Sequence, residues 1–163
     1  MASLPRARYR NCFEPGCSNG ELTKLVAPRC DRLLAVDFVA AAVSRARDAV
    51  REFSHVQVER AALPHELPDD HYDLVILSEL RYYFAHDDLT RLLDGILRRL
   101  EPEGDIIAVH WRASDRCYGY DGFNVHSAIT TRPEMVGLVH HDDENFVLDV
   151  LRRRDSSRPE VPA

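Results

Sequence analysis

Residues 13–20 read Phe13-Glu14-Pro15-Gly16-Cys17-Ser18-Asn19-Gly20, an acidic residue followed by two glycines with small residues between them. A helix-like run, residues 21–27, comes directly after. In open α/β sheets, the turn after the first strand carries small residues so that the backbone approaches a ligand closely. The N–H groups that open the next helix then face the anionic end of that ligand. We therefore expect residues 13–20 to form the ligand-binding turn of a parallel sheet.

A second acidic residue, Asp37, follows the apolar run 33–36. It lies about 20 residues beyond Gly16, where the second strand of a nucleotide-binding unit places the carboxylate that binds a ribose. Asp37 is thus predicted to accept hydrogen bonds from both ribose hydroxyls. The alternative role is an N-cap for the helix that starts near Val39, and the two roles are compatible.

The rest of the first 110 residues alternates between short apolar runs and segments of helical periodicity. The strongest strand is 72–77, which is apolar on both faces, as a strand buried between two layers must be. This β-α-β-α-β-loop-β-α-β order predicts a parallel sheet with right-handed crossovers. The expected strands are residues 9–13, 32–36, 55–60, 72–77 and 106–110.

The helix before the fifth expected strand has a stripe of leucine and isoleucine between residues 89 and 100. We expect Asp87 or Asp88 to cap its first turn, and Pro102 and Gly104 to end it.

Beyond residue 111 the pattern changes. Residues 123–130 favour a short helix, and the apolar runs 135–140 and 145–151 surround a charged tip, which is typical of a β-hairpin. The predicted fold is an α/β, Rossmann-like three-layer sandwich, whose seven-stranded, mostly parallel sheet has an antiparallel C-terminal hairpin strand. We expect a short N-terminal segment (1–12), one domain (13–152) and a disordered tail (153–163).

The chain has 163 residues and a formal net charge of −6, so one acidic domain is expected. An acidic balance argues against nucleic acid or an anionic membrane as the partner. Neither a signal peptide nor an apolar run of transmembrane length is found, and the four cysteines have no metal-site spacing. A cytoplasmic protein with free thiols and no metal is the simplest account, while composition does not indicate an oligomeric state.

The spacing Glu14-x-Gly16-x-Ser18-x-Gly20 resembles motif I of class I S-adenosylmethionine-dependent methyltransferases, which reads acid-x-Gly-x-Gly-x-Gly. Ser18 replaces the middle glycine and would be strained at a positive φ. A mainly parallel sheet closed by a C-terminal hairpin is also the arrangement of that class. The resemblance implies S-adenosyl-L-methionine as methyl donor and S-adenosyl-L-homocysteine as its spent product.

Two further stretches narrow the resemblance. Residues 73–84, Asp-Leu-Val-Ile-Leu-Ser-Glu-Leu-Arg-Tyr-Tyr-Phe, and residues 107–112, Ile-Ala-Val-His-Trp-Arg, are similar to the nodulation protein S group. The hairpin residues 141–151 also fit, so the resemblance extends from about residue 13 to residue 152. Members of that group N-methylate an amino sugar in a lipo-chitooligosaccharide, which implies a small amine or hydroxyl acceptor here.

The resemblance implies a set of cofactor-binding residues. Gly16, Ser18 and Gly20 would lie against the methionine part, although an ordinary tight turn would look the same. Glu14 would orient the loop or the cofactor ammonium, or else be a buried acid bonded to backbone N–H groups. The remaining candidates would contact the adenosine or lie beside it: Phe38, Ala62, Leu63 and Ser78, with core packing as the alternative for Phe38.

Acceptor residues are expected near the ends of the fourth and fifth strands. Glu79 or His110 would take a proton from an amine acceptor or orient it, and a structural histidine is the alternative for His110. Tyr82 and Tyr83 would line the acceptor pocket or pack under the next helix, and Trp111 would lie at its rim.

The chain departs from the family pattern at three places. First, only twelve residues precede Phe13, where the family has a helical segment over the cofactor. Second, Ser18 replaces the middle glycine of the motif. Third, Ala62 stands where the family usually has an acid that holds the adenine amino group. One lost hydrogen bond costs about 0.5–1.5 kcal/mol, so weak cofactor binding or a truncated, non-catalytic domain is an alternative.

Two rival enzymes share parts of this pattern. Gly16-Cys17-Ser18-Asn19-Gly20 also matches the G-x-S-x-G elbow of serine hydrolases, with Ser18 as nucleophile. That reading leaves Asp37 and the hairpin unexplained, and an elbow serine follows several strands rather than one. A nicotinamide dehydrogenase would continue with parallel βα units instead of a hairpin.

Overall fold

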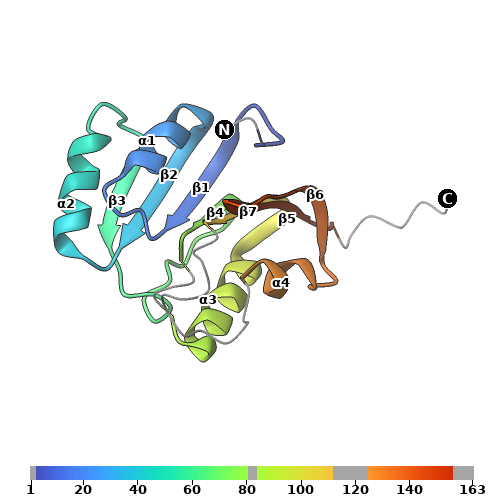
Figure 1. Ribbon diagram of the computed structural model, residues 1–163. Helices are drawn as coiled ribbons and strands as arrows, with labels where there is room; N and C mark the ends of the chain where they lie inside the picture. Colours follow the sequence, from blue (N-terminus) through green and yellow to red (C-terminus); the bar gives the residue numbers. More distant parts are fainter. Residues whose placement is uncertain (1–2, 81–83, 112–124, 156–163) are drawn as a thin grey trace.

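The structure is a computed structural model that describes residues 3–80, 84–111 and 125–155. Strands and helices alternate through most of the chain (Figure 1). The elements in chain order are β1 (Tyr9–Pro15), α1 (Glu21–Val26), the 3₁₀ turn η1 (Ala27–Arg29), β2 (Cys30–Asp37), α2 (Ala40–Ala49), β3 (Val56–Arg60), β4 (Tyr72–Ser78), α3 (His86–Arg99), β5 (Leu100–Trp111), α4 (Val125–Thr130), β6 (Met135–Asp142) and β7 (Phe146–Arg153).

The seven strands form one sheet in the order β3-β2-β1-β4-β5-β7-β6. The five strands from β3 to β5 are parallel, and β7 lies antiparallel between β5 and β6. The predicted fold, including the antiparallel hairpin strand, is therefore confirmed. The parallel strands end at one edge of the sheet, and the turn at residues 16–20 leaves β1 there (Figure 1).

The sheet is covered on both faces, as the doubly apolar β4 requires. Leu74 and Ile76 pack in the cluster that contains Val26 at the end of α1. Their neighbours Val75 and Leu77 point the other way, into the larger cluster formed with α3 and α4. The alternation of side chains along a strand thus sends β4 into two separate cores.

The start of α3 differs from the expectation. Neither Asp87 nor Asp88 caps it, because the helix begins one residue earlier, at His86, with Ala85 at the N-cap and no side-chain cap. The backbone N–H of Leu89 donates to the Ala85 carbonyl at 2.9 Å, which places both aspartates in the first turn. Their negative charge still stabilises that end of the helix dipole.

The expected stop at Pro102 and Gly104 is also wrong. The helix ends at Arg99, and β5 begins at Leu100 and includes both residues. Glu103 has φ 61°, and a Cβ on Gly104 would lie 2.8 Å from the Glu101 carbonyl oxygen. The Pro-x-Gly signal therefore marks a tight irregularity inside the strand, where its pairing register with β4 shifts.

The C-terminal hairpin extends slightly further than expected. Strand β7 includes Arg153, whose guanidinium donates to the Leu100 carbonyl, and the Arg154 N–H donates to the Glu134 carbonyl at 2.8 Å. Residues 156–163 lie outside the described residues, so the disordered tail stays a prediction.

Candidate functional site

The turn after β1 is held against the end of β2 by backbone hydrogen bonds. The N–H groups of Gly16 and Cys17 both donate to the Val36 carbonyl, at 2.7 and 2.9 Å. Gly16 and Gly20 have φ values of 77° and 83°, which glycine adopts without steric cost. The two glycines therefore allow a left-handed turn that brings backbone close to the sheet edge.

Gly20 is also required by packing. A Cβ at this position would lie 2.8 Å from the Ala46 Cα and 3.0 Å from its Cβ. The start of α1 can approach the backbone of α2 this closely only because residue 20 has no side chain.

Asp37 connects the turn to the end of β2. Its Oδ2 accepts a hydrogen bond from the Ser18 N–H at 2.9 Å, and its Oδ1 accepts from the Val39 N–H at 2.9 Å. Val39 is the N-cap residue of α2, so Asp37 is not itself the cap. Each carboxylate oxygen has a second lone pair, so the side chain can still accept two hydroxyl donors.

Ser18 has φ 49°, an uncommon conformation for a residue other than glycine. The bond from its N–H to Asp37 holds the backbone in this conformation, and the side chain is exposed. Within the described ranges, no histidine is hydrogen-bonded to the Ser18 hydroxyl, so the geometry does not favour the hydrolase interpretation.

Glu14 lies directly under the turn. It is 2% exposed, and its Oε2 atom has no hydrogen-bond partner among the described residues. Burial raises the pKa of Glu14 to about 7, an effect that the nearby Thr23 side chain opposes. A buried carboxylate with an unpartnered oxygen is suited to a cationic ligand group.

The expected adenine residues lie beyond the ends of β2 and β3. Phe38 is 63% exposed, so it is not the core residue considered as its alternative. The Ala61 N–H donates to the Asp37 carbonyl at 3.1 Å, which keeps the two strand ends together. Leu63 is half-buried, and Ala62 is exposed with no side-chain acceptor.

Sequence reasoning missed Glu66. Its Oε2 accepts a hydrogen bond from the Ala62 N–H at 2.7 Å, and its own N–H donates to the Ala62 carbonyl at 3.0 Å. A carboxylate therefore lies beside the position where the family pattern leads one to expect an acid. The only signal in the sequence is an acidic residue four positions after Ala62.

The ends of β4 and β5 are connected by Glu79. It has φ 55°, its N–H donates to the Val109 carbonyl at 3.2 Å, and its Oε1 accepts from the Trp111 N–H at 2.6 Å. Strained backbone of this kind clusters at binding sites. Ser78 is half-buried beside it and Trp111 is 57% exposed, whereas Tyr82 and Tyr83 lie outside the described residues.

His110 is 3% exposed near the end of β5. Its Nδ1 lies 3.1 Å from Nε2 of His126 on α4, and His126 Nδ1 lies 2.6 Å from Asp149 Oδ2 on β7. The sequence did not single out His126 or Asp149, since they come from two other elements far along the chain.

The charged hairpin tip resembles a metal site in composition, with His140, His141 and three acidic residues after them. Across residues 3–80, 84–111 and 125–155, no group of three His, Cys, Asp or Glu side chains is arranged to hold a metal ion. His141 is bonded to Asp143 at 2.8 Å within the hairpin. No helix in these ranges has the length and apolar character needed to cross a membrane.

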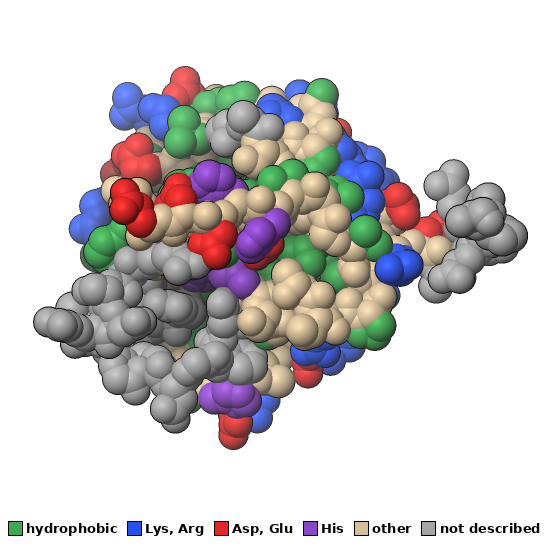
Figure 2. Space-filling model, turned by 45° about the vertical axis from the view of Figure 1, so that its right-hand side comes forward, with side chains coloured by type: hydrophobic (Ala, Val, Ile, Leu, Met, Phe, Trp, Pro, Cys, Tyr) green, Lys and Arg blue, Asp and Glu red, His purple; other side chains and the backbone are tan. Residues whose placement is uncertain are grey.

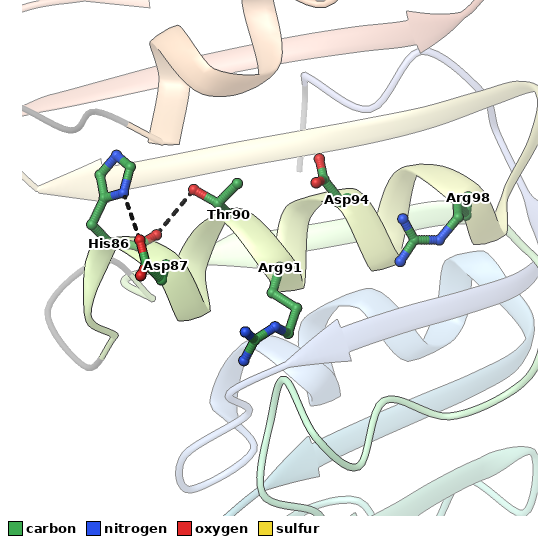
Figure 3. Close-up of a pocket in the computed structure, with 6 residues that line it drawn as sticks. All are labelled: His86, Asp87, Thr90, Arg91, Asp94 and Arg98. Carbon is green, nitrogen blue, oxygen red and sulfur yellow. Dashed lines mark hydrogen bonds and ion pairs between the residues drawn. The ribbon is translucent and has the colours of Figure 1, made fainter.

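One shallow groove lies along the outer face of α3, away from the residues discussed above (Figure 3). It has a volume of about 460 Å³ and a charged lining: His86, Asp87, Thr90, Arg91, Asp94 and Arg98. Arg91 is paired with Asp88, and Asp94 with Arg132. The groove is therefore a solvated helix face, and two of its charged side chains are paired with neighbours.

The sheet order, the glycine turn and the acid at the end of β2 together define the fold of S-adenosylmethionine-dependent methyltransferases. The family model of nodulation protein S (NodS) matches residues 3–121, and the chain belongs to this family.

Three relatives illustrate the similarity. Nodulation protein S of Rhizobium tropici is 29% identical over 108 residues, which are 66% of this chain and 45% of that protein. A candidate methyltransferase from Pseudomonas syringae has a solved structure that is 41% identical, with TM-score 0.81, covering 93% of this chain and 92% of that one. N-methyltransferase NodS from Bradyrhizobium japonicum WM9, solved with S-adenosyl-L-homocysteine, is 23% identical with TM-score 0.75, covering 91% and 80%. The chain spans about half the length of the curated nodulation proteins that it matches.

Proposed function

We propose that this protein binds S-adenosyl-L-methionine and transfers its methyl group to the nitrogen of a small amine acceptor, with an amino sugar or oligosaccharide as the favoured class. The observation that carries the proposal is the hydrogen bond from the Ser18 N–H to Asp37 Oδ2. It brings the glycine turn and the ribose acid together at one sheet edge, as a nucleoside with a methionine tail requires.

The residues present suit this cofactor. Gly16 and Gly20 allow the left-handed turn that would pass beside the methionine part, and the buried carboxylate of Glu14 would suit its ammonium group. Asp37 retains lone pairs for the ribose hydroxyls. The exposed ring of Phe38 would stack on adenine, and Glu66, which accepts from the Ala62 N–H, would supply the acceptor for the adenine amino group that Ala62 lacks.

The cofactor supplies an electrophilic methyl group on a sulfonium, so the protein mainly has to position the acceptor and exclude water. An amine is protonated near neutral pH and must lose a proton before it attacks. Glu79 and His110, at the neighbouring ends of β4 and β5, are the proposed groups for orienting the amine and accepting that proton. Trp111, Tyr82 and Tyr83 are proposed to surround the acceptor.

Isothermal titration with S-adenosyl-L-homocysteine tests the cofactor site. Charged hydrogen bonds are worth about 1.5–3 kcal/mol each, so Asp37→Ala is expected to weaken binding at least tenfold. Asp31→Ala is the matched control, because Asp31 is on the same strand but pairs with Arg8 on the surface. It is expected to change the Kd by less than about twofold.

A folded sample that binds neither S-adenosyl-L-methionine nor its product at millimolar concentration would overturn the proposal. A domain that binds the cofactor without transferring a methyl group is the alternative function. Incubation with labelled methyl donor and a panel of amines, amino sugars first, separates the two by the appearance of methylated product.

A further inference from the structure

A chain of four side chains connects the end of β5 to the surface of the hairpin. His110 Nδ1 lies 3.1 Å from His126 Nε2, and His126 Nδ1 lies 2.6 Å from Asp149 Oδ2. The other oxygen of Asp149 lies 2.7 Å from His140 Nδ1. His110, His126 and Asp149 are each less than 7% exposed, whereas the His140 side chain is 65% exposed.

The strand register explains why these side chains meet. His140 and Asp149 are directly opposed on β6 and β7, and Asp149 is opposed to Ala108 on β5. His110 follows two residues after Ala108, so its side chain lies on the same face of the sheet. Helix α4 covers this face and contributes His126 (Figure 1).

The order of the atoms decides which ring nitrogens carry protons. A carboxylate is an acceptor only, so the nitrogens facing Asp149 must be N–H donors. His126 in its neutral form then has its proton on Nδ1 and a lone pair on Nε2. That lone pair accepts from His110, whose proton is consequently on Nδ1, which leaves the Nε2 of His110 as a lone pair.

His110 is close to the residues proposed to receive the acceptor. Ser78 is opposed to Val109 in the β4–β5 register, and the Glu79 carboxylate accepts from the Trp111 N–H on the other side of His110. The carboxyl edge of these strands is where open α/β sheets bind their ligands.

We infer that His126 and Asp149 are positioning residues that hold His110 in the tautomer with Nε2 unprotonated, so that this atom takes the proton of the amine acceptor. The inference rests on the proposed methyl transfer and names its base. His140 contributes by donating to the second oxygen of Asp149, which keeps the carboxylate oriented toward His126.

The ammonium form of the acceptor loses an N–H proton to His110 Nε2, and its lone pair then forms the bond to the methyl carbon. The carbon–sulfur bond breaks, and its electron pair stays on sulfur. His110 becomes a cation, which the His126–Asp149 pair stabilises because His110 Nδ1–H donates toward it.

The tautomers are measured directly by long-range ¹H–¹⁵N correlation NMR on the ¹⁵N-labelled 163-residue chain at pH 8.5, with and without S-adenosyl-L-homocysteine. We expect His110 and His126 both to carry their proton on Nδ1. Asp149→Ala removes both acceptor oxygens and is expected to change the His126 pattern, while Asp143→Ala, the same change at the hairpin tip, leaves it unaltered. A wild-type His110 with a proton on Nε2, alone or on both nitrogens, would overturn the inference.

Kinetics provide the second measurement, with D-glucosamine as acceptor probe. His126→Leu and His126→Gln are both expected to lower kcat at least tenfold, with the S-adenosyl-L-homocysteine Kd unchanged within twofold. Because Gln retains a hydrogen-bond acceptor for His110, the His126→Gln variant should show a smaller decrease in kcat than the His126→Leu variant. His141→Gln is the control, because His141 is a histidine that does not belong to the four hydrogen-bonded side chains.

Equal kcat in wild-type, Leu and Gln forms would overturn the positioning role. The failure of the proposed function looks different, because the unsubstituted chain would then bind no cofactor in the titration. The NMR measurement requires neither cofactor nor acceptor, so it still decides the tautomer.

Discussion

Glu14 shows at the scale of one residue how the site is maintained at a cost to stability. Its carboxyl is buried beneath the turn and its Oε2 has no partner among the described residues. Burial raises the pKa of Glu14 to about 7 from the ordinary value of 4.5. The folded state therefore holds this proton more tightly than the unfolded state does.

The consequence is a pH-dependent stability. The contribution of the Glu14 carboxyl to the free energy of unfolding is fully present below about pH 4.5. It is lost as the pH rises through about 7, because the folded state must then bury a charge. The difference between pKa values corresponds to about 3 kcal/mol. Glu14→Gln should therefore be more stable than wild type at pH 8 and similar at pH 4.5.

Urea unfolding at both pH values checks this prediction. Glu21→Gln, an exposed acid in the first turn of α1, is the control and should leave the pH dependence as in wild type. If Glu14→Gln gave no gain at pH 8, the carboxyl would have to be hydrated or partnered in solution. The same variant should weaken S-adenosyl-L-homocysteine binding if Glu14 contacts its ammonium group.

The approach of α1 to α2 is the corresponding feature at the scale of secondary-structure elements. Gly20 starts α1 at φ 83° and leaves no room for a Cβ beside the Ala46 backbone. Both the conformation and the contact require glycine, so the shape of the glycine turn depends on helix packing as well as on the loop itself.

Gly20→Ala is expected to destabilise the fold by about 1–3 kcal/mol and to weaken S-adenosyl-L-homocysteine binding. The added methyl group would clash with the backbone of Ala46, which cannot move aside. Chemical denaturation and calorimetry measure the two effects. Gly137→Ala is the matched control, since a Cβ there meets nothing within 4 Å. The free energy of unfolding of Gly137→Ala should be within about 0.5 kcal/mol of the wild-type value. A Gly20→Ala protein with wild-type stability would contradict the packing argument.

The elements themselves were largely predictable. The apolar run of β4 and the periodic stripe of α3 are local signals, and both were placed within one or two residues. The errors are at the α3 cap and at Pro102–Gly104, because helix caps and strand irregularities depend on which backbone groups find partners in the folded chain.

At the scale of the whole molecule, Asp105 joins segments from both ends of the chain. It is fully buried on β5, where it accepts from Arg152 Nε at 2.7 Å and from the Tyr9 hydroxyl at 2.8 Å. Arg6 lies 3.6 Å away. Burial and the neighbouring carboxylate raise the pKa of Tyr9, so the hydroxyl remains a donor.

Asp105→Ala would leave these donors without a buried acceptor and is expected to cost about 3–5 kcal/mol. Urea unfolding followed by circular dichroism measures the loss. Asp88→Ala, which breaks an exposed pair with Arg91, should cost less than about 1 kcal/mol. A small effect of Asp105→Ala would mean that β1 and β7 are held to β5 without this carboxylate.

One part of the candidate site, Asp37 with the glycine turn, could be predicted from the sequence, whereas the contacts of Glu66 and His126 could not. Asp37 and the glycine turn were expected to converge, because a strand–turn–helix unit brings residues at fixed sequence spacing to one edge. Glu66 and His126 were not expected, since each acts through a contact that the spacing does not specify.

Local order along the chain was enough to predict the fold class, the family and the glycine turn at the sheet edge, because apolar periodicity and glycine positions act over a few residues. The hydrogen-bonded series from His110 through His126 and Asp149 to His140 was decided by the tertiary structure alone. His126 is 16 residues from His110, and Asp149 is 23 residues from His126. The β5–β7–β6 register and the packing of α4 bring them within hydrogen-bonding distance, and no periodicity in the sequence encodes that pairing.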